Sequence, residues 1–145
     1  MNNLNILLIG LGNMGNIHKR IIENIKNVSL VGILDSSFTK EVSANNKIKH
    51  YNKFNQINFE DEKIDGVVIS STTATHYGLA KKILALNIPL FIEKPVSTNV
   101  DEVNELVETA KRKKIVLRAG LIEIYNPIFL HIKKLDLKDI ISTVS

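Results

Sequence analysis

The sequence predicts an α/β protein built on a doubly wound parallel sheet, and two observations carry this prediction. First, apolar runs of strand length alternate with stretches of helical period along the 145-residue chain. This alternation is typical of βαβ units, in which helices cover both faces of a parallel sheet. Second, the first apolar run leads directly into the glycine turn Gly10-Leu11-Gly12-Asn13-Met14-Gly15. A strand, a glycine turn and a helix in this order open a Rossmann-type fold.

The elements of the first half follow from the spacing of apolar residues. Residues 4–9 are expected to form the first strand and residues 28–34 the second. The helix between them carries four apolar residues on one face, namely Met14, Ile17, Ile21 and Ile25. A short helix is expected over residues 39–45, followed by a weak third strand at 48–51 and a fourth strand at 67–70.

The second half continues the alternation. Residues 74–86 predict a helix, and Pro89 opens a fifth strand at 90–92, where a missing amide donor is tolerated. A helix over 99–113 and a strand over 115–119 complete a sheet of about six strands.

Beyond this sheet the apolar pattern becomes weaker. A further short helix is predicted from Ile128, Leu130, Ile132 and Leu135, and residues 140–144 resemble the beginning of a strand.

The composition indicates a folded globular domain and excludes several classes of protein. Hydrophobic residues make up 44% and charged residues 23% of the chain, outside the range of disorder. No cysteine is present, so neither a disulfide framework nor a thiolate metal site is expected. The apolar run 83–92 is about half the ~20 residues that a membrane helix needs, and no basic leader precedes the first strand. We therefore expect a cytoplasmic protein without a membrane partner and without a metal.

The net charge of +4 raises the question of a nucleic-acid partner. The densest basic cluster is residues 111–114, and it falls in the last turn of the predicted helix 99–113. Cations there favour the negative end of the helix dipole, and no aromatic residues interleave with them to stack on bases. The sequence therefore predicts no nucleic-acid partner.

The glycine turn predicts a dinucleotide-binding site. Gly10 would make the tight turn, Gly12 would let the backbone approach a pyrophosphate, and Gly15 would permit close packing of helix and strand. The first helical amides, at Asn13 and Met14, would face the phosphates together with the positive end of the helix dipole. A structural turn without a ligand remains the alternative.

Asp35 predicts which dinucleotide is bound. It ends the second strand, twenty residues beyond Gly15, where an acidic side chain accepts hydrogen bonds from ribose hydroxyls. A carboxylate would repel a 2′-phosphate, and the next residues include no arginine to hold one. NAD is therefore favoured over NADP, with a simple turn residue as the alternative for Asp35.

Lys94 follows the fifth strand, at the edge of the sheet where ligands of open α/β proteins bind. Its amino group could hydrogen-bond a substrate hydroxyl at the nicotinamide end of the cofactor and assist hydride loss. Lys94 and the neighbouring Glu93 are also expected to contact the cofactor. The alternative is a surface ion pair between Lys94 and Glu93, which would matter little.

Glu93-Lys94-Pro95 and the glycine turn together resemble the Gfo/Idh/MocA family of NAD(P)-dependent oxidoreductases. The resemblance implies that Lys94 takes part in catalysis and that its bond to Pro95 is cis. Residues 69–76 are similar to a family segment that ends in histidine, although Thr72 stands where proline is common. By this likeness, the channel from adenosine to nicotinamide would be lined by Ser71, Thr72, Thr73 and His76. A helix-surface histidine is the alternative for His76.

Residues 119–127 are similar to a Gly-His-x-Glu-Arg-Phe/Tyr-Asn-Pro form that occurs in sugar and nucleotide-sugar dehydrogenases of the family. Leu121 replaces its histidine and Ile124 its arginine. The resemblance then implies that Tyr125 and Asn126 contact the substrate together with Lys94, and that the substrate is a sugar, a nucleotide sugar or a cyclitol. Tyr125 is equally explicable as a packed aromatic residue.

The resemblance also implies a division of the chain. Residues 1–125 would form the NAD(P)-binding domain, and 126–145 a connecting helix and the start of a substrate domain whose remainder is missing. We therefore expect the isolated chain to bind NAD but to be inactive. The apolar residues of 126–145 would lie exposed and offer a surface for homo-oligomerisation.

Two other classes of protein use a similar turn. A free-standing NAD sensor would need the glycine turn and Asp35, but it has no use for Glu93-Lys94-Pro95. A methyltransferase that binds adenosylmethionine lacks a reason for the third glycine.

Overall fold

The computed structural model describes residues 3–38 and 48–132. They form one sheet of six strands with the order β3-β2-β1-β4-β5-β6, and every neighbouring pair is parallel. This is the doubly wound sheet that the sequence predicts.

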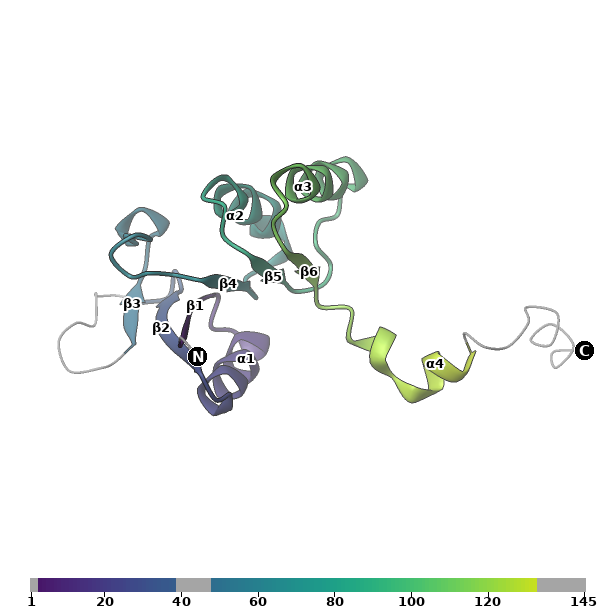
Figure 1. Ribbon diagram of the computed structural model, residues 1–145, viewed down its shortest axis with the longest axis horizontal. Helices are drawn as coiled ribbons and strands as arrows, with labels where there is room; N and C mark the ends of the chain where they lie inside the picture. The colour runs from purple at the N-terminus through teal and green to yellow at the C-terminus, as the bar shows by residue number, and fades with distance from the viewer. Residues whose placement is uncertain (1–2, 39–47, 133–145) are drawn as a thin grey trace, which may run out of the picture.

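The strands and helices lie close to their predicted positions (Figure 1). The strands are β1 (Leu4–Ile9), β2 (Val28–Leu34), β3 (Lys49–Tyr51), β4 (Gly66–Ile69), β5 (Leu90–Ile92) and β6 (Leu117–Ala119). The helices are α1 (Asn13–Asn24), α2 (Thr73–Ala85), α3 (Val100–Lys113) and α4 (Pro127–Ile132), with 3₁₀ turns η1 (Phe54–Gln56) and η2 (Ile122–Tyr125). The last strand begins at Leu117 rather than at residue 115. The predicted helix 39–45 and strand 140–144 lie outside the described residues.

The strand order reverses beside β1, which pairs with β2 on one side and β4 on the other. Parallel strands bring their carboxyl ends to one edge of the sheet, and a reversal of order opens a crevice there. The glycine turn after β1, the segment after β4 and Glu93 after β5 all lie at this edge. The fold therefore brings together the segments to which the sequence analysis assigned ligand contacts.

The two faces of the sheet are covered unequally. Helices α2 and α3 lie on one face and α1 on the other (Figure 1). The larger core cluster lies under α2 and α3 and includes Ile83, Leu84 and Leu106, each at most 1% exposed. The smaller cluster contains Leu8, Ile22, Leu30 and Ile33. Each such side chain contributes about 1.5–3 kcal/mol on burial, so the α2–α3 face supplies most of the apolar stabilisation.

The apolar face predicted for the first helix is partly exposed, although Ile22 of α1 is buried in the core. Met14, Ile17, Ile21 and Ile25 share one face as predicted, yet they are 37–51% exposed. The residues of α1 that are buried are Gly15 and Ile22. Successive residues of a helix differ by about 100°, so the close packing of Gly15 turns the predicted apolar face partly to the outside.

The basic cluster lies at the end of α3 as predicted, and one of its lysines makes a contact that the sequence analysis did not anticipate. Lys113 Nζ donates hydrogen bonds to the carbonyl oxygens of Leu84 and Ala85 at the end of α2, at 2.8 and 3.1 Å. At the other end of α3, Asn99 Oδ1 caps the helix by accepting from the Asp101 amide at 2.8 Å. The Lys113 contacts join α3 to the end of α2, and the Asn99 contact is confined to α3.

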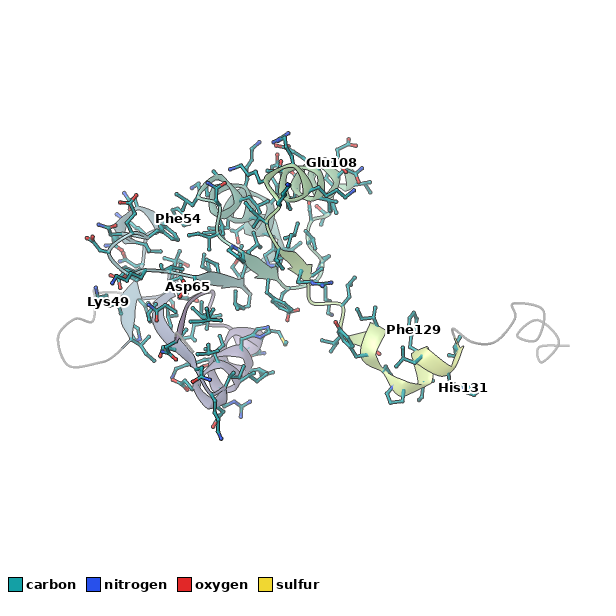
Figure 2. All side chains as sticks on the ribbon, in the orientation of Figure 1. Lys49, Phe54, Asp65, Glu108, Phe129 and His131 are labelled. Carbon is teal, nitrogen blue, oxygen red and sulfur yellow. The ribbon has the colours of Figure 1, made fainter. Side chains whose placement is uncertain are left out.

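Helix α4 stands apart from the sheet, and Figure 2 shows Phe129 and His131 on it. Its apolar side chains are 41–70% exposed, namely those of Ile128, Phe129, Leu130 and Ile132. Among the described residues, no helix combines the length and apolar character that crossing a membrane requires.

Candidate functional site

The glycine turn leaves no room for side chains at two of its three glycines. Gly10 has a φ of +92°, and a Cβ on it would lie 2.5 Å from the Ser71 nitrogen. A Cβ on Gly15 would lie 2.1 Å from the Gly10 carbonyl oxygen. Only glycine satisfies both the conformation and the contact distance. The turn is therefore built as its spacing predicts.

Gly12 differs from the other two, because a Cβ on it would meet nothing within 4 Å. The space beside it is open, as close approach of a ligand requires. Helix α1 begins here without a hydrogen bond from a capping side chain and without an acidic residue in its first turn. Its first amides, at Asn13 and Met14, therefore have no competing side-chain acceptor, and the helix dipole favours an anion. The residues present fit a dinucleotide pyrophosphate.

Asp35 closes the turn from the end of β2. Its carboxylate accepts hydrogen bonds from the backbone N–H groups of Leu11 at 2.6 Å and Ser37 at 2.9 Å. Burial by itself would raise the pKa of Asp35, but hydrogen bonds from the Ser37 side chain and from these two amides outweigh burial and hold the pKa below its usual value. Asp35 is thus both a turn residue and a half-buried carboxylate beside the glycine turn.

Ser70 is a residue that the sequence analysis did not single out. It directly follows β4, is buried, and donates a hydrogen bond to the Gly10 carbonyl oxygen at 2.9 Å. A serine directly after an apolar strand gave no signal of this contact, because its partner lies 60 residues earlier in the chain.

The segment after β4 places three of the predicted cofactor residues at the start of α2. Ser71 Oγ lies 2.7 Å from Thr75 Oγ1, Thr72 is the N-cap residue, and Thr73 is the first residue of the helix. The Ser71 backbone lies against Gly10, and Thr72 and Thr73 follow it in the chain. Their contact with a cofactor stays a prediction.

The structure excludes one of the two interpretations of His76. It is 1% exposed, so it is not a helix-surface histidine. Its Nδ1 lies 2.8 Å from the Pro95 carbonyl oxygen and its Nε2 lies 3.0 Å from that of Ser71. Both ring nitrogens lie within hydrogen-bond distance of backbone carbonyl oxygens, and the predicted contact of His76 with the cofactor stays a prediction. The ring joins the segments after β4 and β5.

Glu93 and Lys94 diverge at the end of β5. Glu93 is buried, and its Oε1 lies 2.8 Å from His18 Nε2 of α1. Lys94 is exposed, and within the described part of the chain no ion pair joins it to Glu93. The ion-pair alternative is therefore wrong. The Lys94–Pro95 peptide bond is cis, as the resemblance implies.

Tyr125 and Asn126 lie farther along the chain, after β6. Tyr125 is 75% exposed, so the ring is not packed against the described residues. Asn126 Oδ1 accepts a hydrogen bond from the Ile128 amide at 3.0 Å and caps α4, while its Nδ2 donates to Glu123 at 2.9 Å. Their predicted contact with substrate stays a prediction.

Comparison with known proteins supports the interpretation of the glycine turn. Residues 4–121 match the Gfo/Idh/MocA oxidoreductase family, described as an NAD-binding Rossmann fold. The chain belongs to this family. It is thus an NAD-binding domain of the Gfo/Idh/MocA family, and NAD is its cofactor.

Two curated relatives illustrate the range of the Gfo/Idh/MocA family. A myo-inositol 2-dehydrogenase of Thermotoga maritima is 29% identical over 120 residues, which are 81% of this chain and 36% of the relative. A UDP-N-acetylglucosamine 3-dehydrogenase of Acidithiobacillus ferrooxidans is 25% identical over 129 residues, 88% of this chain and 40% of the relative. The chain therefore spans less than half the length of these relatives.

A solved structure has the same fold as this Gfo/Idh/MocA domain. GenD2 from gentamicin A biosynthesis, in complex with NAD, superposes with a TM-score of 0.77 at 21% identity over 90% of this chain and 38% of GenD2.

Proposed function

We propose that this domain serves a dehydrogenase that transfers a hydride between NAD and a hydroxyl-bearing carbon of a sugar, nucleotide sugar or cyclitol. Bound NAD supplies the hydride acceptor. Lys94 binds the substrate hydroxyl and, as the neutral amine, accepts its proton as the carbonyl forms. One observation carries the proposal: Lys94 is exposed at the sheet edge that also carries the glycine turn, and within the described residues it has no ion-pair partner.

The other contacts predicted from the sequence are part of the same proposal. Gly12 and the first amides of α1 bind the pyrophosphate, and Asp35 binds the ribose. Ser71, Thr72, Thr73 and His76 border the cofactor between them. Glu93 contributes to the cofactor contact from its buried position. Tyr125 and Asn126 contact the substrate. Residues 1–125 form the cofactor domain and 126–145 the connection to a substrate domain. A cytoplasmic location stays a prediction from the sequence.

The cofactor is tested with the 145-residue chain by calorimetric titration with NADH and NADPH. NADH is expected to bind, and NADPH is expected to bind at least about tenfold more weakly, which corresponds to ~1.4 kcal/mol, because the Asp35 carboxylate repels a 2′-phosphate. Tighter binding of NADPH would contradict the role of Asp35. Failure of both to bind would contradict the pyrophosphate site.

The chemistry is tested in the complete enzyme with NAD⁺ and a panel that includes myo-inositol and UDP-N-acetylglucosamine. Lys94→Ala is expected to lower kcat by about 10²-fold or more, the range for losing a general acid or base, with NAD affinity nearly unchanged. An unchanged kcat would mean that Lys94 has no catalytic role and that the domain serves only to bind NAD.

The open position of Lys94 also predicts that the 145 residues alone turn over no substrate, because substrate orientation contributes a large part of the rate enhancement. Turnover by the purified 145-residue chain would show that the site is complete within it.

A further inference from the structure

Glu93 is a buried carboxylate at a point where three segments of the fold meet. Its side chain is 8% exposed, and His18 Nε2 of α1 lies 2.8 Å from its Oε1. On another side, a Cβ built on Gly120, directly after β6, would come within 2.8 Å of Glu93 Oε2. The carboxylate is therefore enclosed by segments that come before and after it in the chain.

His18 is itself restrained. Its side chain is 15% exposed, and its ring meets Phe91 of β5 edge-on, with centroids 5.3 Å apart and planes at 65°. His18 lies three residues after Gly15 and therefore on the same side of α1. The helix that begins at the glycine turn is thus held at two points, by Gly15 against Gly10 and by His18 against Glu93.

Glu93 is also joined to Lys94 by a hydrogen bond. Its Oε2 accepts from the Lys94 backbone N–H at 3.1 Å, and its own N–H donates to the Ile69 carbonyl oxygen at 2.9 Å. The peptide from which the Lys94 side chain departs is therefore restrained by the carboxylate. A buried carboxylate that loses its partner is unfavourable, so without His18 the Glu93 side chain would turn toward water and release the Lys94 amide.

We propose that His18 is a positioning residue for Lys94 and acts through the Glu93 carboxylate. The pair ties the helix that faces the pyrophosphate to the loop that carries the lysine, so that cofactor and lysine keep a constant relative position. This inference rests on the proposed function, because it concerns the placement of Lys94 for catalysis.

The test compares two substitutions of His18 with a matched control. His18→Leu removes the hydrogen bond, whereas His18→Gln keeps an N–H donor near the position of Nε2. Lys19→Leu is the control, because Lys19 lies on the same helix and its pair with Glu23 is a surface pair at 3.7 Å, of a kind that contributes little.

Two readouts are used. Hydrogen exchange at the Lys94 amide is measured in the 145-residue chain, and it requires no substrate. The kinetic constants kcat and KM, with NAD⁺ and myo-inositol as the probe, and the Kd for NADH are measured in the complete enzyme.

His18→Leu is expected to speed exchange at the Lys94 amide by about tenfold or more. It should lower kcat by roughly 10- to 10²-fold, the cost of a small misplacement, while the Kd for NADH stays within about twofold of wild type. His18→Gln should restore most of both properties, and Lys19→Leu should match wild type.

Unchanged exchange in His18→Leu would overturn the inference whether or not myo-inositol is a substrate. A His18→Gln variant as impaired as His18→Leu, or a parallel loss of NADH binding and kcat, would reduce His18 to a purely structural residue. In the same assay, full kcat in Lys94→Ala refutes the proposed function. Loss of kcat in Lys94→Ala together with full kcat in His18→Leu refutes only the positioning role.

Discussion

The cofactor half of the site, around the glycine turn, is held by many contacts, whereas the substrate half, around Lys94 and Tyr125, is exposed. In the cofactor half, hydrogen bonds of Ser70 at 2.9 Å and Asp35 at 2.6 Å hold the glycine turn, and Gly15 packs so closely on Gly10 that no Cβ fits there. In the substrate half, Lys94 is exposed and Tyr125 is 75% exposed. A nucleotide site can thus be assembled within one sheet. In the substrate half, the sheet supplies reactive side chains, but the described residues do not enclose them.

The largest expected effect comes from the glycine turn. Substitutions of Gly12 and Gly15 distinguish an effect on NADH affinity from an effect on the free energy of unfolding. Gly15→Ala should lower the free energy of unfolding by about 1–3 kcal/mol, because its Cβ collides with the Gly10 carbonyl. It should also abolish NADH binding. Gly12→Ala should leave stability unchanged, because its Cβ meets nothing, yet weaken NADH binding by at least about tenfold, ~1.4 kcal/mol.

Urea unfolding and calorimetry check this pair of variants. Gly78→Ala in α2 is the control, since a Cβ there also meets nothing within 4 Å and Gly78 is none of the predicted site residues. It should stabilise the chain by about 0.4–1 kcal/mol without changing NADH affinity. Wild-type NADH affinity in Gly12→Ala would contradict the assignment of the open space to the pyrophosphate.

Asp35 gives the cofactor half a pH dependence. Because the pKa of Asp35 is lower in the fold than its ordinary value of 3.8, the carboxylate stabilises the fold above that value, and this stability is lost as the pH falls through the lower folded pKa. Asp35→Asn should therefore cost about 1 kcal/mol at pH 7, and the difference from wild type should shrink in acid. Urea unfolding from pH 7 to about pH 3 measures it. Glu60→Gln, at an exposed position, is the control, and a difference that grows in acid would refute the sign.

Helix α4 tests the open half directly. The apolar side chains of α4 are exposed, and few contacts oppose its local opening. Amide hydrogen exchange in α4 should therefore be at least about 10²-fold faster than in α2. Hydrogen exchange followed by mass spectrometry compares the two helices at several protein concentrations. Slower exchange at higher concentration would indicate that α4 mediates self-association, and exchange as slow as in α2 would show that the substrate half is closed. The expected low protection of residues 133–145 lies outside the described residues.

The smallest expected effect is that of Tyr125→Ala. Because the ring is 75% exposed, stability should change by less than about 0.5 kcal/mol, and NADH affinity should stay the same. In the complete enzyme, KM for the sugar should rise. Tyr51→Ala is the matched control, because Tyr51 is 5% exposed and its loss should cost about 3 kcal/mol. A comparable loss of stability in Tyr125→Ala would show that the ring packs in solution.

Local signals in the sequence were sufficient for much of the fold and for the cofactor half. The three glycines stand within six residues after an apolar strand, and the backbone conformation that they permit is a local property. Asp35 follows from strand length and spacing, because the end of β2 must reach the same edge of the sheet as the end of β1. Apolar periodicity likewise predicted the strands and helices, since burial on one face leaves a pattern in the chain itself.

The tertiary structure decided what depends on partners distant in the chain. His18 and Glu93 are 75 residues apart, and only the packing of α1 beside β5 brings them together. His76 is buried because the segments after β4 and β5 close over it. The apolar face predicted for α1 is partly exposed because the contact of Gly15 with Gly10 sets the rotation of the helix. Periodicity specifies that a helix has a face, but the direction of that face is set by a steric contact made only in the folded chain.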